Sequence, residues 1–155
     1  MERAVILVGT ETGTAEDIAD ELSEAFSEAG IEAEIHDMED VEVDVIDPSK
    51  ALIICTATHG DGELPDNSTE FYEAIEDEGS DLSGVSFAVL VLGDSAYADF
   101  CEAGKIWSGF LTGLGATEVV GRYEIDGYPE DDDVEGAREW ATEAADKFAE
   151  LVREG

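Results

Sequence analysis

Basic residues are scarce in this chain of 155 residues, which has 7 Lys and Arg against 41 Asp and Glu. The formal net charge is −34 at pH 7. Nucleic acids and anionic membranes are bound by basic surfaces, so neither is an expected partner. The acidic residues are spread along the chain and do not form one tail. At about 1 M salt the Debye length falls to roughly 3 Å, which screens such repulsion, and we therefore expect a protein from a salt-accumulating halophile.

Long apolar runs and clusters of metal-binding residues are also missing. No segment approaches the roughly 20 apolar residues needed to span a bilayer, and Met1–Arg3 leads directly into a short apolar run, unlike a signal peptide. Cys55 and Cys101 form no CxxC pair, and His36 and His59 lack the HExxH spacing of a zinc site. We expect a soluble cytoplasmic protein without a disulfide or a metal.

What the chain does contain is a regular alternation of short apolar segments and amphipathic helical segments. Strands are predicted at Arg3–Val8, Ile31–His36, Ala51–Cys55, Phe87–Leu92 and Ala116–Val120, the last with an extension through Tyr123–Ile125. Three- and four-residue apolar spacing predicts helices over Ala15–Phe26, after Asp66, over Ile106–Leu114 and over Trp140–Val152. Gly30 and Gly115 follow two of these helices as expected stops.

This alternation predicts one doubly wound α/β domain over residues 1–155. The segments Ala51–Cys55 and Phe87–Leu92 are continuously apolar, as expected for parallel strands that are covered on both faces. In such sheets, ligands bind beyond the carboxyl ends of the strands, where the strand order reverses. The loops after the first, third and fourth strands are therefore the candidate binding segments.

The first of these loops, Thr10–Glu11–Thr12–Gly13–Thr14–Ala15, suits a phosphate group. It places hydroxyl groups and a glycine directly before a helix, whose N-terminus offers free N–H donors and a positive dipole end. It lacks both GxGxxG and the Gly-Lys-Ser/Thr of a P-loop. Thr14 would also cap a helix in a protein without a ligand, so the loop alone leaves both interpretations open.

The second and third loops have compositions that suit a planar ligand. Thr56–Asn67 contains two glycines and a proline, which indicates an ordered loop with unusual backbone angles. Leu92–Lys105 contains Tyr97, whose phenol ring can stack on a flat ring system. A loop tyrosine is usually an ordinary surface residue, so its weight comes from the three loops together.

Together the three loops resemble those of the flavodoxin family, which includes short-chain flavodoxins and the FMN domains of diflavin reductases. Thr10–Ala15 is similar to the family's T/S-x-T-G-x-T/A phosphate loop. Thr56–Asn67 resembles S/T-T-Y-G-x-G-x-x-P-D-N, and Leu92–Cys101 resembles L-G-D/N-S-x-Y-x-x-F-C/N. The resemblance covers nearly the whole chain. It implies a flavodoxin-like, five-stranded parallel sheet in the order 2-1-3-4-5 with helices on both faces.

The resemblance also implies FMN as cofactor and assigns it residues. Gly60 falls on the glycine that meets flavin N5, and Tyr97 on the aromatic residue that stacks on one ring face. His59 stands where Tyr or Trp is commoner, although flavodoxins of the MioC type share Thr-His-Gly, so stacking and a solvent-facing histidine both stay open. The full set is Thr10, Glu11, Thr12, Gly13, Thr14 and Ala15 for the phosphate, Ala57, Thr58, His59, Gly60 and Gly62 in the second loop, and Leu92, Gly93, Asp94, Tyr97, Phe100 and Cys101 in the third.

The expected function is that of an electron carrier with no catalytic residues of its own. A chain of this length, filled by one FMN domain, is expected to lack an FAD and NADPH module. The carrier would work as a monomer that accepts single electrons from a reductase and passes them to an acceptor oxidoreductase. Two alternatives remain, an NAD(P)H-dependent FMN quinone or azo reductase and a flavodoxin-fold protein without flavin.

Overall fold

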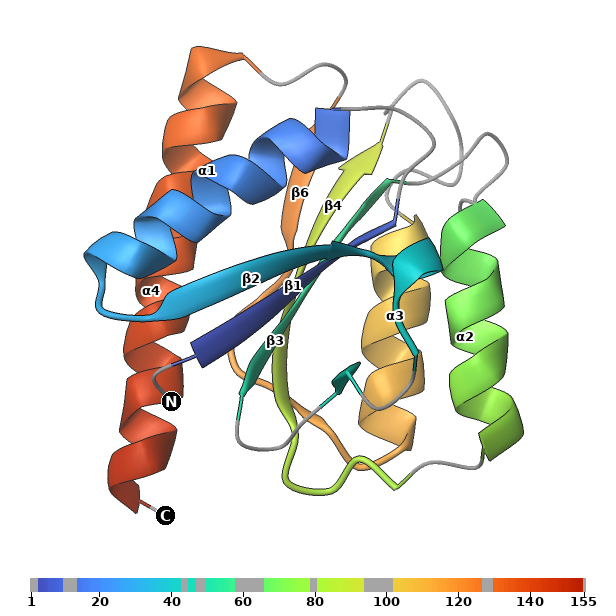
Figure 1. Cartoon of the computed structure of the whole chain (residues 1–155). Coiled ribbons are helices and arrows are strands. Elements are labelled where there is room, and N and C mark those ends of the chain that lie inside the picture. The colour runs from blue at the N-terminus through green and yellow to red at the C-terminus, as the bar shows by residue number, and fades with distance from the viewer. Residues whose placement is uncertain are drawn as a thin grey trace.

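The computed structural model describes residues 3–9, 14–42, 45–46, 50–57, 66–78, 81–93, 102–126 and 130–154. Strands and helices alternate along the chain (Figure 1). Their order is β1 (Arg3–Gly9), α1 (Thr14–Glu28), β2 (Glu32–Asp37), the 3₁₀ turn η1 (Met38–Asp40), β3 (Ala51–Ala57), α2 (Asp66–Glu78), β4 (Ser86–Gly93), α3 (Glu102–Gly113), β5 (Thr117–Glu118), β6 (Tyr123–Asp126) and α4 (Asp131–Glu154).

All strand pairs in the described sheet are parallel, in the order β2-β1-β3-β4-β5, with β6 also paired to β4. The predicted doubly wound α/β fold and strand order are therefore confirmed. The predicted fifth strand is divided, because β5 pairs with the start of β4 and β6 with its end. Between β5 and β6 the chain does not pair with β4 as a strand. Here the carbonyl of Gly121 accepts a hydrogen bond from the indole N–H of Trp140 at 2.8 Å.

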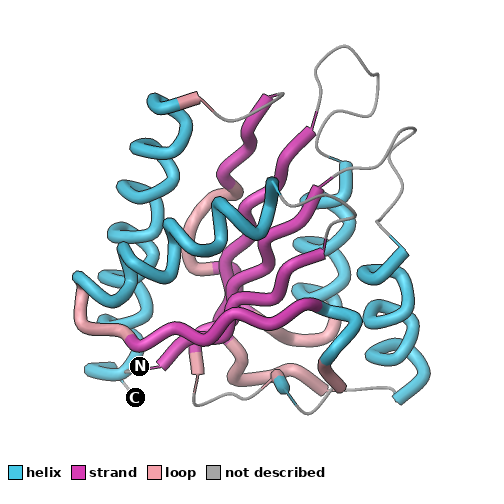
Figure 2. The backbone as a smooth tube through the Cα atoms, turned by 45° about the horizontal axis from the view of Figure 1, so that its top comes forward, coloured by secondary structure: helices cyan, strands magenta, loops and turns pink. Residues whose placement is uncertain are grey.

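Both faces of the sheet are covered by helices, α1 and α4 on one and α2 and α3 on the other (Figure 2). Neighbouring residues of a strand point to opposite faces. On β1, Ile6 and Val8 pack with α1 and α4, whereas Val5 and Leu7 pack on the side of α2 and α3. The central strands must therefore be apolar at every position, which explains the continuous apolar runs in the sequence.

The two tryptophans are core residues, one on each face of the sheet. Trp107 of α3 is fully buried among Phe71, Tyr72 and Phe110, with ring centroids 5.6–6.2 Å away. Trp140 of α4 is buried on the other face, where its indole N–H holds the segment between β5 and β6. The helices are thus anchored by large aromatic side chains on both faces.

The predicted helix signals are also confirmed where the structure describes them. Gly30 and Gly115 end α1 and α3 with φ angles of 90° and 105°. After each glycine, the next N–H donates to the carbonyl five residues earlier, at 2.8 Å and 3.1 Å, as in a Schellman motif. At the start of α4, the Asp133 carboxylate accepts the N–H of Glu130 at 3.0 Å. Asp131 and Asp132, which open this helix, are exposed to solvent.

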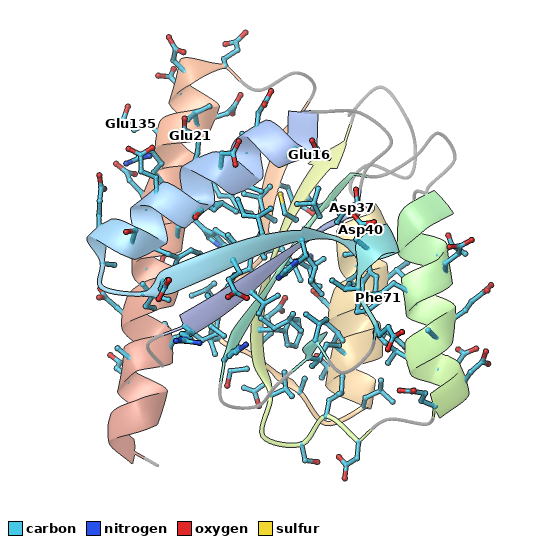
Figure 3. All side chains as sticks on the ribbon, in the orientation of Figure 1. Glu16, Glu21, Asp37, Asp40, Phe71 and Glu135 are labelled. Carbon is cyan, nitrogen blue, oxygen red and sulfur yellow. The ribbon has the colours of Figure 1, made fainter. Side chains whose placement is uncertain are left out.

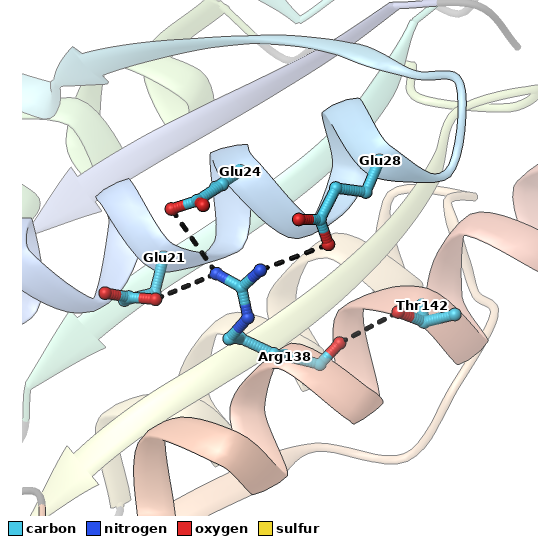
Figure 4. Close-up of polar contacts among 5 residues, drawn as sticks. All are labelled: Glu21, Glu24, Glu28, Arg138 and Thr142. Carbon is cyan, nitrogen blue, oxygen red and sulfur yellow. Dashed lines mark hydrogen bonds and ion pairs between the residues drawn. The ribbon is translucent and has the colours of Figure 1, made fainter. Parts of the chain in front are cut away.

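One arginine joins α1 to α4 across the surface (Figure 4). The guanidinium of Arg138 lies 2.9 Å from Glu21, 3.5 Å from Glu24 and 3.1 Å from Glu28. The hydrogen bond with Glu21, followed by the charges of Glu24 and Glu28, raises the pKa of Arg138 above its ordinary value. One positive charge here faces three acidic side chains of the same helix, which would otherwise repel one another.

We expect Arg138→Gln to lower the urea midpoint of unfolding, because it removes a charge partner that three glutamates share. Lys147→Gln is the matched control. It makes the same change in net charge on the same helix, but among the described residues the ion pair of Lys147 is with Glu150 of its own helix, at 3.9 Å. The difference between the two variants should shrink from roughly 0.1 M to 1 M KCl, as the Debye length falls from about 10 Å to about 3 Å. Equal effects of the two substitutions would contradict a stabilising link between the helices.

Candidate functional site at the carboxyl edge of the sheet

The strands β1, β3 and β4 end side by side at one edge of the sheet. Gly9, the last residue of β1, pairs with Thr56, and Ala57, the last residue of β3, pairs with Leu92 near the end of β4. Gly93, the last residue of β4, pairs with Asp126 of β6. The three predicted binding loops therefore start from adjacent positions, although the first and the third start more than 80 residues apart in the sequence.

Helices begin after each of these loops, α1 at Thr14, α2 at Asp66 and α3 at Glu102. In a strand–loop–helix unit of this kind, the helix N-terminus follows the carboxyl end of the strand, so its N–H donors and positive dipole end lie toward this edge. Glu16 in the first turn of α1 and Asp37 at the end of β2 give the edge an acidic rim (Figure 3). An anion bound here would be held by backbone donors and not by the rim.

A buried hydrogen bond ties the ends of two strands together. The Thr56 hydroxyl donates to the carbonyl of Gly9 at 2.8 Å, and both residues are buried. This bond fixes β3 to β1 at the last residue before the predicted phosphate loop. Thr56 was not among the predicted site residues, and the signal that could have found it is a hydroxyl at the end of an otherwise apolar strand.

Cys55 lies one residue earlier and is an inert core residue. Burial raises the pKa of its thiol to about 12, so the thiol stays protonated at neutral pH. The expectation that Cys55 ends its strand is wrong by two residues. β3 continues to Ala57, because Thr56 and Ala57 still pair with Val91 and Leu92 of β4.

The structure places five of the predicted FMN residues at this edge. Thr14 and Ala15 open α1, Ala57 ends β3, and Leu92 and Gly93 end β4. Of these five, the buried side chain of Leu92 packs in the core on the side of α1 and α4. The other predicted residues lie outside the described ranges, so their contacts stay predictions: Thr10, Glu11, Thr12, Gly13, Thr58, His59, Gly60, Gly62, Asp94, Tyr97, Phe100 and Cys101.

Within the described ranges, no three His, Cys, Asp or Glu side chains gather in a way that could hold a metal ion. None of the described helices is both long enough and apolar enough to cross a membrane.

Comparison with known proteins gives this edge a family context. A family model described as flavodoxin matches residues 6–140, which include all three loops. The solved structure of oxidised Flavodoxin 1 from Bacillus cereus is 30% identical, with a TM-score of 0.83, and the match covers 91% of this chain and 95% of that one. Oxidised Flavodoxin 2 from Bacillus cereus is 32% identical, with a TM-score of 0.84, over 96% of this chain and 99% of that one.

Curated relatives are longer proteins that match over one part. The sulfite reductase [NADPH] flavoprotein alpha-component of Vibrio parahaemolyticus is 32% identical over 154 residues, which are 99% of this chain but 24% of that protein. Its counterpart in Bacillus subtilis is 31% identical over 126 residues, which are 81% of this chain but 21% of that protein. The chain thus spans about a quarter of the length of these relatives. Since the family model matches most of its residues and such relatives exceed 30% identity, the chain belongs to the flavodoxin family.

Proposed function

We propose that this chain binds one FMN at the carboxyl edge of its sheet and carries single electrons between a reductase and an acceptor oxidoreductase. The observation that carries the proposal is the adjacent ending of β1, β3 and β4, each of which continues into one of the three motif loops. Bound FMN would supply the redox chemistry, and the protein would hold and orient it.

The phosphate end of FMN fits the start of α1. Between Gly9 and Ala15 the chain has three threonine hydroxyls and no Lys or Arg. A phosphate in this place would be bound by these hydroxyls, by backbone N–H groups from Thr10 to Ala15 and by the dipole of α1. Neutral donors of this kind suit an acidic chain, because they hold an anion without a basic side chain that neighbouring carboxylates would attract.

The flavin ring fits between the second and third loops. Their first residues after the sheet follow Ala57 and Gly93, whose strands are hydrogen-bonded neighbours. Ala57, Thr58, His59, Gly60 and Gly62 would line one side of the ring. The backbone of Leu92, Gly93 and Asp94, with the rings of Tyr97 and Phe100 and the Cys101 side chain, would line the other side. Whether His59 stacks on the ring or faces solvent stays open.

A carrier role also fits the size of the matched segment. The sulfite reductase flavoproteins are named for NADPH, yet only about a quarter of their length matches this chain. We place NADPH oxidation on a reductase outside this flavodoxin domain, and the domain, as a cytoplasmic monomer, between that reductase and its acceptor. Its acidic rim suits partners with basic docking surfaces.

The first prediction is that the protein binds one FMN per chain and that Gly13→Val weakens the binding. A branched side chain at Gly13 would hold the backbone away from the phosphate, so we expect the Kd to rise at least about tenfold. Gly121→Val is the control, because a Cβ at this exposed loop glycine meets no atom within 4 Å. Titration of the apoprotein with FMN, followed by flavin fluorescence, measures both. An unchanged Kd for Gly13→Val would contradict the proposal that the first loop binds the phosphate of FMN.

The second prediction separates the carrier from the two alternatives. Under anaerobic conditions, NADPH alone should leave the visible flavin absorbance unchanged, whereas NADPH with a catalytic amount of an NADPH-dependent flavodoxin reductase should bleach it. Dithionite serves as the positive control for a reducible flavin. Rapid bleaching by NADPH alone would favour the quinone or azo reductase. Failure of the apoprotein to take up FMN would favour the flavin-free protein.

The third prediction tests the proposal that the chain comes from a halophile, and it concerns the dependence of stability on salt. With a net charge of −34, both the melting temperature and FMN retention should rise from roughly 0.1 M to molar KCl, as the repulsion between carboxylates is screened. Sucrose at equal osmolality is the control, because it favours the compact state without screening charge. Equal melting temperatures at both KCl concentrations would remove the halophile interpretation.

A further inference from the structure

The backbone of α3 touches β4 at Gly104, in the first turn of the helix. Gly104 is buried, and a Cβ placed on it would lie 2.7 Å from Cγ1 and 3.0 Å from Cβ of Val91. Val91 is itself buried, two residues before β4 ends at Gly93. Real Cβ atoms essentially never lie as close as 2.7 Å to another atom, so a residue larger than glycine would require Val91, the helix or the strand to shift.

The contact lies two residues before the end of β4 and two residues after the start of α3, the two elements that the third predicted FMN loop joins in the sequence. Residues 94–101 run from the end of β4 to the start of α3, so the spacing between these two elements is the gap that the loop closes. β4 is held between its neighbours by strand pairing, whereas the position of α3 depends on how it packs on the sheet. The contact of Gly104 with Val91 therefore sets where the far end of the loop begins.

We propose that Gly104 is a positioning residue for FMN. Its close contact with Val91 sets the depth of α3 on β4, and through it the placement of the loop that carries Asp94, Tyr97, Phe100 and Cys101. The proposal rests on the proposed function, since it assumes that this loop meets the flavin. It adds a residue that the three loop motifs do not contain and that does not itself touch the cofactor.

The same helix provides matched control positions. Gly109 and Gly113 also lie in α3, but both are exposed and a Cβ at either would meet nothing within 4 Å. Glycine inside a helix lowers its stability relative to alanine, so Gly109→Ala should be stabilising. The third nearest atom to the added Cβ at Gly104 is Cδ of Arg122, at 3.3 Å. That atom belongs to a flexible, exposed side chain that can move, whereas the two nearer atoms belong to the short, buried side chain of Val91.

A purely structural role for Gly104 makes a different prediction from a positioning role. If Gly104→Ala only overpacked the core, it would destabilise the apoprotein and the FMN complex equally, and the Kd would not change. If α3 instead moves outward in the variant, FMN binding has to draw the loop back against that strain. The affinity and the optical signature of the bound flavin then change together with stability.

The experiment compares Gly104→Ala, Gly109→Ala, Val91→Ala and the double variant Val91→Ala/Gly104→Ala in the full chain. For each we measure the urea midpoint of the apoprotein, the FMN Kd and the visible circular dichroism of the bound flavin. Gly104→Ala should lower the midpoint, raise the Kd roughly tenfold and change the visible dichroism. Gly109→Ala should raise the midpoint and leave both flavin readouts as in the parent protein. In the Val91→Ala background the Kd effect of Gly104→Ala should fall below about threefold.

Each outcome bears on one of the two proposals. A Gly104→Ala protein with reduced stability but with the parent Kd and dichroism would overturn the positioning role. If that variant does not fold, Val91→Ile takes its place, because it adds a methyl group to the same contact from the strand side. An unchanged Kd and dichroism for Val91→Ile would then overturn the inference. Absence of FMN binding by the parent protein would instead overturn the proposed function.

Discussion

The parallel pairing of β1, β3 and β4 is the constraint on which the other features of the candidate site depend. It aligns Gly9 with Thr56 and Ala57 with Leu92, and so brings three distant segments to one edge. The buried bond from the Thr56 hydroxyl to the Gly9 carbonyl fixes two of the strand ends relative to each other. Because this bond lies in the dry core, replacing its donor by an apolar group would leave a buried carbonyl unsatisfied. The edge is therefore rigid up to the last residue of each strand.

The charge of the chain limits how this edge can bind an anion. A lysine or arginine in the first loop would have many carboxylates competing for it, as Arg138 does with three glutamates of α1. Backbone N–H groups and hydroxyls carry no such competition. The helix α1 connects the two effects. Arg138 offsets part of the negative charge on the face of α1 that opposes α4, and the N-terminus of α1 begins at Thr14 on the functional edge. The packing of α1 on α4 therefore holds the helix whose N-terminus forms part of the predicted phosphate site.

The sequence predicts most of this fold because its strands differ sharply from their surroundings. β1, β3 and β4 were located to within two residues, since central parallel strands are apolar on both faces. The division of β5 from β6 could not be predicted, because it depends on the distant indole of Trp140. The same holds for Arg138, which meets glutamates more than 100 residues away. The contact of Gly104 with Val91 is equally invisible to periodicity, because glycine has no apolar side chain to count. The three loops were found from motifs alone, and no periodic signal specifies their side-chain contacts.

Contacts below the loops, and not only residues in them, determine how well the edge can hold a cofactor. A loop that must be ordered on binding uses part of the interaction free energy for that ordering, whereas a loop with fixed ends uses less. Here the first and second loops start from strands joined by Thr56, and the third runs from β4 to a helix whose depth is set at Gly104. Neither residue was among the predicted cofactor-binding residues, yet Thr56 acts on the ends of the first two loops and Gly104 on one end of the third. The affinity of this family member for its cofactor should therefore depend on the core packing under the site as much as on the residues that face the ligand.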